Sequence, residues 1–376
     1  MNLNFPHLFQ AFDPSTGLYP GSTPEARGIL EYAYAHPEIA LAVSLDETNF
    51  CLEPPRGGRR GDADLSQIRI PNNYVEMLQA ERGQTYTLEE VIEMTRKVVP
   101  ASVEVDADMV AGFLGLGAAV NPLKPDLEFY DALSKKYKAY LEEKEAGGDR
   151  LPPADAADGS FELWAYYHLG VPVFSLDLFG IPSEEKKPGE EKSETPAADA
   201  AQLARLHYAD SLLGSRGFVD WTPYKHPELG DVEIGGFPPY LETPPHETVK
   251  GILDVQIPWI LELAEQLPSL ALAETRITPR GSEVYLLEVW VRNEAFLPFP
   301  TAMGKRNRQP APAIILLEGK GIEFLEGRAR TPVPSVEGHS TVKQSWLIRA
   351  GQKTELNIRL ECPAAGNDQT TAKLGI

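Results

Sequence analysis

A short helix that leads directly into an apolar strand is the feature that most constrains the fold of this chain, and it occupies residues 158–180. Ser160 is a favourable N-cap residue and Gly170 a favourable residue just beyond a helix C-terminus, so residues 161–169 are predicted to form two turns of helix. Residues 171–178 are rich in Val, Phe and Leu and are predicted to form the strand. A helix and a strand joined this closely must share one core, which favours an α/β domain.

One carboxylate, Asp177, lies inside this apolar strand. Successive side chains of a strand alternate between its faces, so Asp177 shares a face with Ser175, while Phe174 and Leu176 share the other. Burial raises the pKa of a carboxyl group unless a cation or hydrogen-bond donors compensate, and this shift prepares the group to act as a general base. The alternative is a strand-end Asp that caps a loop or pairs with a Lys. Periodicity alone favours this alternative.

The composition describes an acidic globular protein. The 376 residues carry 55 Asp and Glu against 35 Lys and Arg, a formal net charge of −20, and 42% of them are hydrophobic. This length is enough for two domains, and the negative charge disfavours nucleic acid and anionic membrane surfaces as partners because both repel an anion. No apolar run approaches the roughly 18 residues of a membrane-spanning helix, and residues 1–11 lack the features of a signal peptide. Cys51 and Cys362 are predicted to be structural or incidental, with a disulfide bridge between them as the less favoured alternative, and the compartment stays open.

The chain changes character near residue 270. Helix and strand signals alternate through residues 1–270, whereas short strand signals separated by Gly, Pro and Asn dominate residues 271–376. We therefore predict an α/β domain followed by an antiparallel β-sandwich, with Trp290 and Trp346 in the sandwich core. Residues 183–200, rich in Glu, Lys and Pro, cannot bury enough apolar surface to order themselves and are predicted to be a mobile insertion.

Local signals place the further elements. Capping residues and apolar stripes predict helices at residues 24–36, 88–98, 126–144, 202–213 and 246–267. Pro258 is expected to kink or break the last of these helices. Apolar and β-branched runs predict strands at residues 39–45, 283–291, 313–317, 345–350 and 355–362.

Three stretches, taken in chain order, resemble segments of the carboxypeptidase A-like zinc peptidases. Residues 2–6 (NLNFP) resemble the family's Asp-x-Asn-Arg-Asn-Phe/Trp segment, and a helix start follows at residues 22–27 (STPEAR). Residues 159–178 resemble the end of the catalytic domain, with Gly-Ser, Trp-x-Tyr, a Gly and then Phe-Ser-x-acid-Leu. Residues 218–237 are similar to a segment of bacterial members that carry a C-terminal β domain. The resemblance covers most of residues 1–270 and implies the family's mixed-sheet α/β fold, without its N-terminal part.

The positions that carry the family's chemistry are substituted in this chain. The family binds zinc through a His-x-x-Glu pair and one further His, but the 376 residues contain no His-x-x-Glu, and the further His position falls on Asp46. The position of the Arg that binds the substrate carboxylate falls on Leu3, which cannot form a bidentate fork. The position of the catalytic Glu falls on Asp177, which is one methylene shorter. A catalytic zinc needs three protein ligands, so the resemblance implies a metal site that this chain has lost.

Two functions stay open. In the first, the chain is a non-catalytic carboxypeptidase-like protein without a cofactor, which binds a peptide or cell-wall-derived ligand or serves as a scaffold. In the second, it is a zinc-dependent carboxypeptidase that removes C-terminal residues, completed by a His-x-x-Glu segment upstream of Met1. The resemblance places Asp177 at the catalytic position, Asp46 at a metal-ligand position, Asn2 at a substrate-binding position and Phe161 at the floor of an apolar specificity pocket. We favour the first function because three separate roles are substituted.

Overall fold

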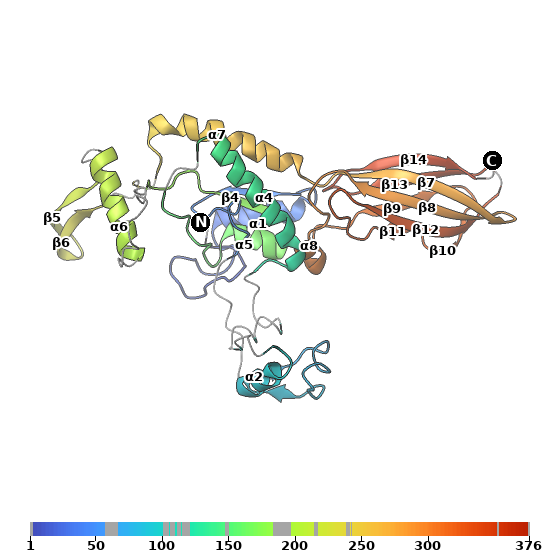
Figure 1. Ribbon diagram of the computed structural model, residues 1–376, viewed down its shortest axis with the longest axis horizontal. Coiled ribbons are helices and arrows are strands. Elements are labelled where there is room, and N and C mark those ends of the chain that lie inside the picture. The colour runs from blue at the N-terminus through green and yellow to red at the C-terminus, as the bar shows by residue number, and fades with distance from the viewer. Residues whose placement is uncertain are drawn as a thin grey trace.

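The structure is a computed structural model that describes residues 3–56, 67–100, 105, 110, 114, 121–146, 150–182, 197–213, 217–237, 241, 243–351 and 353–374. It consists of a mixed α/β body and a C-terminal β-sandwich (Figure 1). The predicted combination of an α/β part with a C-terminal antiparallel sandwich is therefore confirmed. None of the described helices is long and apolar enough to cross a membrane.

The α/β body is built around two short parallel strands, β1 (Ala42–Leu45) and β4 (Val173–Leu176). The surrounding helices are α1 (Pro24–Ala35), α4 (Lys124–Glu143), α5 (Phe161–Trp164), the π-helix η1 (Ala165–Leu169) and α7 (His246–Glu265). Buried aromatic rings dominate the core between them, and the largest are Tyr130, Trp164 and Trp259. Helix α7 continues through Pro258 without a break. In the described part of the chain this sheet has two strands, where the resemblance implies a larger one.

The helix-to-strand stretch begins and ends as its capping residues predict. The Ser160 hydroxyl accepts a hydrogen bond from the amide of Leu163 at 3.4 Å, and Gly170 ends the helical segment with a left-handed φ of 74°. A Cβ at Gly170 would lie 2.5 Å from the Cα of Gly304, so the close approach of a second segment also requires glycine there. Between the two caps the structure differs from two turns of α-helix, because the helix widens to a π-helix after Trp164.

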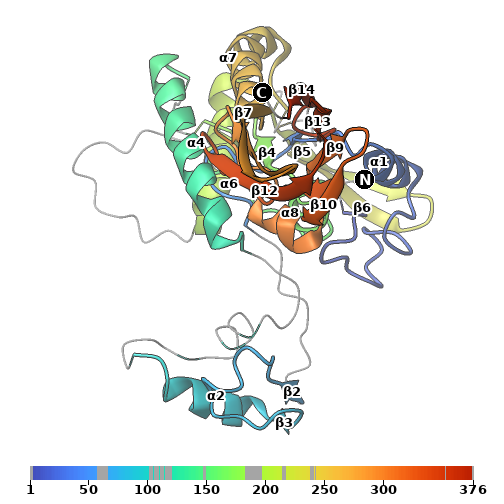
Figure 2. The same cartoon turned by 90° about the vertical axis from the view of Figure 1, so that its right-hand side faces the viewer.

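Two smaller units are attached to the body. The first has its own apolar core and contains β2 (Ile68–Arg69), β3 (Thr85–Tyr86) and α2 (Leu88–Arg96), which Figure 2 shows below the main body. The second contains α6 (Ala197–His207), the π-helix η2 (Tyr208–Leu212) and the hairpin of β5 (Val219–His226) and β6 (Gly230–Gly236). The insertion predicted over residues 183–200 lies outside the described residues up to 196, and residues 197–200 belong to α6.

The C-terminal sandwich consists of two four-stranded antiparallel sheets. One sheet has the order β10 (Glu323–Glu326), β12 (Thr341–Arg349), β8 (Val284–Asn293) and β7 (Leu270–Gly281). The other has the order β11 (Arg330–Pro332), β9 (Ile314–Glu318), β13 (Glu355–Glu361) and β14 (Asp368–Lys373). Inward-facing aliphatic side chains of both sheets form one core.

The two Trp residues predicted for the sandwich core differ in position. Trp346 is buried in that core, as predicted. The prediction for Trp290 is wrong, because the alternation of β8 turns Val289 and Val291 inward and Trp290 outward. Its ring lies between two cations on the outer face, 5.0 Å from the Arg276 guanidinium carbon and 5.7 Å from the Lys343 Nζ atom.

The sandwich is joined to the α/β body through the short helix α8 (Ala302–Asn307), which lies in the connection between β8 and β9. Asp126 of α4 is buried, and its carboxylate accepts hydrogen bonds from the amides of Ala302 at 2.7 Å and Met303 at 3.0 Å. It also accepts a bond from the Tyr166 hydroxyl at 2.8 Å. Burial raises the pKa of Asp126, and these donors partly offset the shift. The α/β body and the sandwich are therefore joined by hydrogen bonds as well as by apolar contacts.

Candidate functional site

Asp46 and Asp177 lie at the same end of the two-stranded sheet. Strands β1 and β4 are parallel and paired in register from Ala42 with Val173 to Leu45 with Leu176, so the residue that follows each strand is an Asp. The amide of Asp46 donates to the carbonyl of Leu176 at 3.3 Å, which extends the ladder by one step. The structure thus brings together two residues that are far apart in sequence, although their side chains engage different partners.

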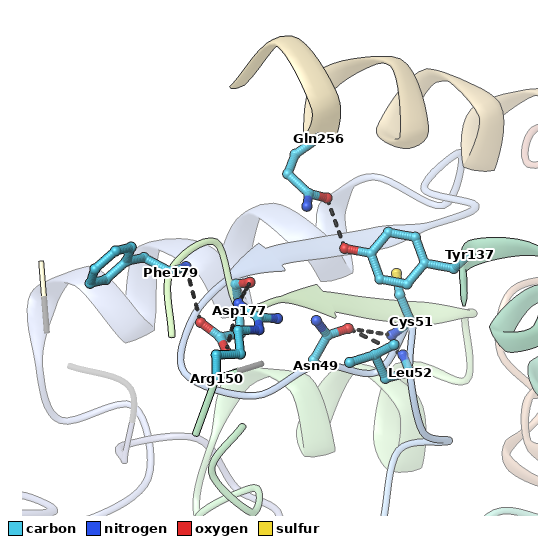
Figure 3. A network of polar contacts seen from close by, with 8 residues as sticks. All are labelled: Asn49, Cys51, Leu52, Tyr137, Arg150, Asp177, Phe179 and Gln256. Atoms are coloured by element: carbon cyan, nitrogen blue, oxygen red, sulfur yellow. Dashed lines mark hydrogen bonds and ion pairs between the residues drawn. The ribbon is translucent and has the colours of Figure 1, made fainter. Parts of the chain in front are cut away.

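The Asp177 carboxylate is 7% exposed and is held by a turn and by a cation. Its Oδ1 atom accepts a hydrogen bond from the amide of Phe179 at 3.2 Å, and its Oδ2 atom lies 3.4 Å from the Nη1 atom of Arg150 (Figure 3). The same Nη1 atom donates to the backbone carbonyl of Asp177 at 3.2 Å. Both oxygens are engaged, an arrangement that fixes the carboxylate and the Arg side chain against each other.

A second acid, Glu162 of α5, is fully buried behind β1. Its Oε1 atom accepts a hydrogen bond from the Ser44 hydroxyl at 3.1 Å, while its buried Oε2 atom receives none from a described residue. Burial raises the pKa of Glu162, and the neighbouring Asp46 carboxyl raises it further. Protonation of Glu162 removes the repulsion between the two acids, so the environment of Glu162 favours its neutral form.

The loop after β1 is fixed to β4. The Ser175 hydroxyl accepts hydrogen bonds from the Thr48 hydroxyl at 2.7 Å and from the Phe50 amide at 2.9 Å. The Asn49 Oδ1 atom accepts from the amides of Cys51 at 3.2 Å and Leu52 at 3.1 Å (Figure 3). Ser175 belongs to the polar face of the strand, which the sequence assigned to Ser175 and Asp177. Its two hydrogen bonds to the loop give that face a structural role.

Open cavities surround the segment that follows Arg150. One of about 750 Å³ lies beneath α7 and is lined by Arg150, Leu178 and Gln256, and another of about 320 Å³ is lined by Asp177 and Arg205. Behind the first cavity, the buried Tyr137 hydroxyl donates to Oε1 of the lining residue Gln256 at 2.9 Å, and burial raises the pKa of Tyr137 to about 12 (Figure 3). This hydroxyl therefore stays protonated at neutral pH and acts as a donor.

Of the two residues expected to bind substrate, the structure describes Phe161. Asn2 lies outside the described residues. Phe161 packs on Phe5 and Trp164, with ring centroids 5.5 and 6.0 Å away. It lines an apolar groove of about 620 Å³ between α1 and β1, and neither Asp46 nor Asp177 lines that groove. The structure therefore places Phe161 in a different cavity from Asp177.

The residues around Asp46 do not fit a catalytic zinc ion. Within the described ranges, no three His, Cys, Asp or Glu side chains converge in a way that could hold a metal ion. Cys51 and Cys362 are buried free thiols. Burial raises the pKa of Cys51 to about 12 and that of Cys362 to about 11, so neither is a ready thiolate ligand.

Sequence reasoning missed two residues of this site, Arg150 and Glu162. The signal for Glu162 was a charged residue in a helix whose neighbours, Leu163 and Trp164, are apolar and buried. Its pairing with Asp46 is a contact across 116 residues and has no local signature. Arg150 follows two Gly residues and an Asp at the end of a predicted helix, and nothing in that context points to Asp177.

Comparison with known proteins bears mainly on the C-terminal part. A family model described as "Domain of unknown function (DUF8731)" matches residues 269–373, which contain the sandwich. No curated protein is similar in sequence to the chain.

Three solved structures are similar to 28% of the chain. The archaellum periplasmic stator protein FlaG from Sulfolobus acidocaldarius is 13% identical over its whole length, with a TM-score of 0.18. The GAE domain of GGA2p from Saccharomyces cerevisiae is 9% identical over 96% of its length, with a TM-score of 0.18. The FlaF and FlaG complex from Sulfolobus acidocaldarius gives 12% identity over 90% of the matched chain and a TM-score of 0.17. These scores are too low to bear on function.

Proposed function

We propose that this chain is a non-catalytic carboxypeptidase-like protein whose α/β body binds a peptide without hydrolysing it. The observation that carries the proposal is the state of Asp177, the residue that the resemblance assigns to the position of the family's catalytic Glu. Both of its oxygens are engaged, one by the Phe179 amide and the other by Arg150. These two contacts hold the carboxylate between a turn and a cation, as in a structural ion pair, which supports a structural role for Asp177.

The second acid at this end of the sheet supports the same proposal. Glu162 is fully buried and its pKa is raised, but it contacts Ser44 and Asp46 rather than an open cavity. A buried acid of this kind can hold a proton, and Glu162 is not among the residues that line the three cavities described above. Its raised pKa therefore reports burial and a neighbouring acid rather than preparation for catalysis.

The groove lined by Phe161 supports the proposal that the α/β body binds a peptide. Its volume of about 620 Å³ is within the range of ligand sites, and most of its lining is aliphatic or aromatic. A peptide with apolar side chains fits this lining better than a cell-wall-derived sugar, which needs several convergent hydrogen-bonding groups. Tyr32, 61% exposed, lies at the groove and gives a peptide an accessible aromatic contact.

Two measurements on the full chain test the proposal. Incubation with zinc and a panel of peptides is expected to release no C-terminal amino acids, and binding of an apolar peptide is expected to weaken in Tyr32→Ala. The control is Tyr224→Ala, which removes an exposed ring from β5, far from α1 in Figure 1. Release of C-terminal residues that Asp177→Asn abolishes would overturn the non-catalytic proposal. If the parent and both variants bound the peptide equally well, the groove would not be the peptide-binding site.

A further inference from the structure

Strand β1 has a free hydrogen-bonding edge in the described part of the chain, where its single neighbour is β4. The amides of Ala42 and Asp46 donate to Pro172 and Leu176 of the β4 segment. Because a parallel ladder uses alternate residues of each strand, the amides of Val43 and Leu45 point away from β4. The outer edge of β1 thus presents backbone donors and acceptors in strand geometry.

The opposite edge of the same sheet is closed. The amide of Val173 in β4 points away from β1 and donates to the Tyr130 hydroxyl of α4 at 3.1 Å. Tyr130 is buried, and burial raises its pKa well above the ordinary value, so the hydroxyl remains a neutral partner. A side chain of α4 thus occupies the outer edge of β4, whereas no described strand pairs with the outer edge of β1.

The apolar groove described above includes Ala42 and Val43, the first two residues of β1. It is lined by Gly28, Ile29 and Tyr32 of α1, by Val43 of β1, and by Phe161. Leu45, at the end of β1, is 58% exposed. Natural edge strands are usually protected by charged residues, Pro or a bulge, and β1 has none of these among its four residues. An apolar groove beside an open edge is the geometry that strand addition requires.

The charges around the groove define the partner. Glu25 is the only charged residue among the described groove-lining residues, and Asp46 and Glu47 directly follow β1. The whole chain carries a net charge of −20. A second copy of the chain brings the same negative charge and is repelled, whereas a segment with Lys or Arg beside its apolar residues is attracted.

We infer that the edge of β1 binds an extended segment of a partner protein, with alternating apolar residues flanked by Lys or Arg, as a third strand. The segment pairs its backbone with Val43 and Leu45 and places alternate side chains in the groove. This inference rests on the proposed peptide-binding function and gives it a mode of recognition. Main-chain bonds supply affinity, and the groove and the acidic residues supply selectivity.

The first test uses a fluorescein-labelled peptide of alternating Val and Thr with Lys at both ends. A matched peptide carries N-methyl groups on alternate amides, which removes backbone donors and leaves the side chains unchanged. The plain peptide is expected to bind the full chain, and the methylated peptide at least roughly tenfold more weakly, the equivalent of about 1.4 kcal/mol. Equal binding of both peptides would overturn strand addition while leaving peptide binding intact. Binding of neither would count against the proposed function as well.

The second test uses a matched pair of variants at Leu45, whose amide faces the open edge. Leu45→Pro removes that donor without touching the bonds to β4, and Leu45→Ala removes only the side chain. The Leu45→Pro variant is expected to bind the peptide roughly tenfold more weakly than the parent, and the Leu45→Ala variant is expected to lose much less affinity. Amide exchange at Val43 and Leu45 is expected to be fast in the free protein and slowed by the peptide. Slow exchange in the free protein, or a dimer that forms through this edge, would overturn the inference.

Discussion

Replacement of Glu162 by Gln is expected to stabilise the α/β body at neutral and alkaline pH. In the parent chain, Glu162 is fully buried, and its Oε2 atom receives no hydrogen bond from the described residues. Gln has nearly the same shape, and its oxygen can still accept from the Ser44 hydroxyl, which lies 3.1 Å from Glu162 Oε1. Its amide group can also donate to the Asp46 carboxylate, so two acids that repel each other when both are ionised become a permanent donor and acceptor pair.

The sign of the pH dependence follows from the direction of the pKa shift. Burial, and then Asp46, raise the folded-state pKa of Glu162 above its ordinary value of 4.5. Between the two values the folded state holds a proton that the unfolded chain has released, so the free energy of unfolding falls by up to about 1.4 kcal/mol per pH unit as pH rises. At a pH below the ordinary pKa, Glu162 is protonated in both states and does not reduce the free energy of unfolding. At a pH above the folded-state pKa, Glu162 is ionised in both states and the free energy of unfolding is reduced by the full amount.

The increase in the free energy of unfolding that we expect from Glu162→Gln is therefore close to zero at acidic pH and largest at alkaline pH. A buried polar group left without its partner costs about 1–3 kcal/mol, which sets the size of the gain at about pH 8. Because the chain contains several separate cores, amide exchange of β1 and α5 is the suitable measurement, since it reports the opening of this body alone. The control is Glu25→Gln, which neutralises an exposed acid of the same body.

A gain for Glu162→Gln of the same size at about pH 4 and about pH 8 would refute the reasoning, because it would show that the proton plays no part. A gain matched by Glu25→Gln would show that the relief of general negative charge is responsible. Asp46→Asn supplies a further check, because it also places a donor in the pair. The double variant should then gain less than the sum of the two single variants.

Three further outcomes are expected. Asp126→Ala leaves the amides of α8 and the Tyr166 hydroxyl without their acceptor and should destabilise the junction of body and sandwich by roughly 3 kcal/mol, seen as separated transitions in urea. Arg150→Met leaves the buried Asp177 without its cation and should cost about 1–3 kcal/mol, measured by thermal unfolding. Cys51, whose pKa is raised to about 12, should react with iodoacetamide only when the body unfolds, which timed mass spectrometry checks.

Elements with a local cause could be predicted from the sequence. The Thr87 and Glu90 capping box that predicts a helix is present, with both reciprocal bonds formed. Four predicted sandwich strands correspond to β8, β9, β12 and β13, because each alternates or carries a β-branched run. The first sandwich strand, β7, was not predicted, since its polar residues and Pro279 obscure the alternation.

Features that depend on long-range contacts could not be predicted. The sequence identified Asp177 and offered a strand-end Asp paired with a Lys as one reading, but nothing local specified Arg150 as the cation. Widening of the helix after Trp164 is another such feature. It accompanies the contact of Gly170 with Gly304, a residue 134 positions away that belongs to α8. Burial of Glu162 depends likewise on how β1 and α5 pack, which no residue of α5 determines alone.

The buried acids of this chain are accommodated in three physical ways, and these ways predict how the whole protein responds to pH. Asp177 is paired with a cation, Asp126 accepts from three neutral donors, and Glu162 accepts from the Ser44 hydroxyl beside a second acid that raises its pKa. Burial raises the pKa of both Asp126 and Glu162, so both favour the folded state at mildly acidic pH and lose this advantage as pH rises.

Acids with lowered pKa values act in the opposite sense, but screening by solvent makes exposed pairs weak. These acids are Asp13, Glu38 and Glu288. The net charge of −20 adds repulsion that also grows as carboxyl groups ionise. Burial also lowers the pKa of His168, which acts in the opposite sense as pH falls below the ordinary histidine value. Burial raises the pKa of Cys51 and Tyr137 to about 12, so these groups cost stability in alkali, and the free energy of unfolding should be greater at neutral than at alkaline pH.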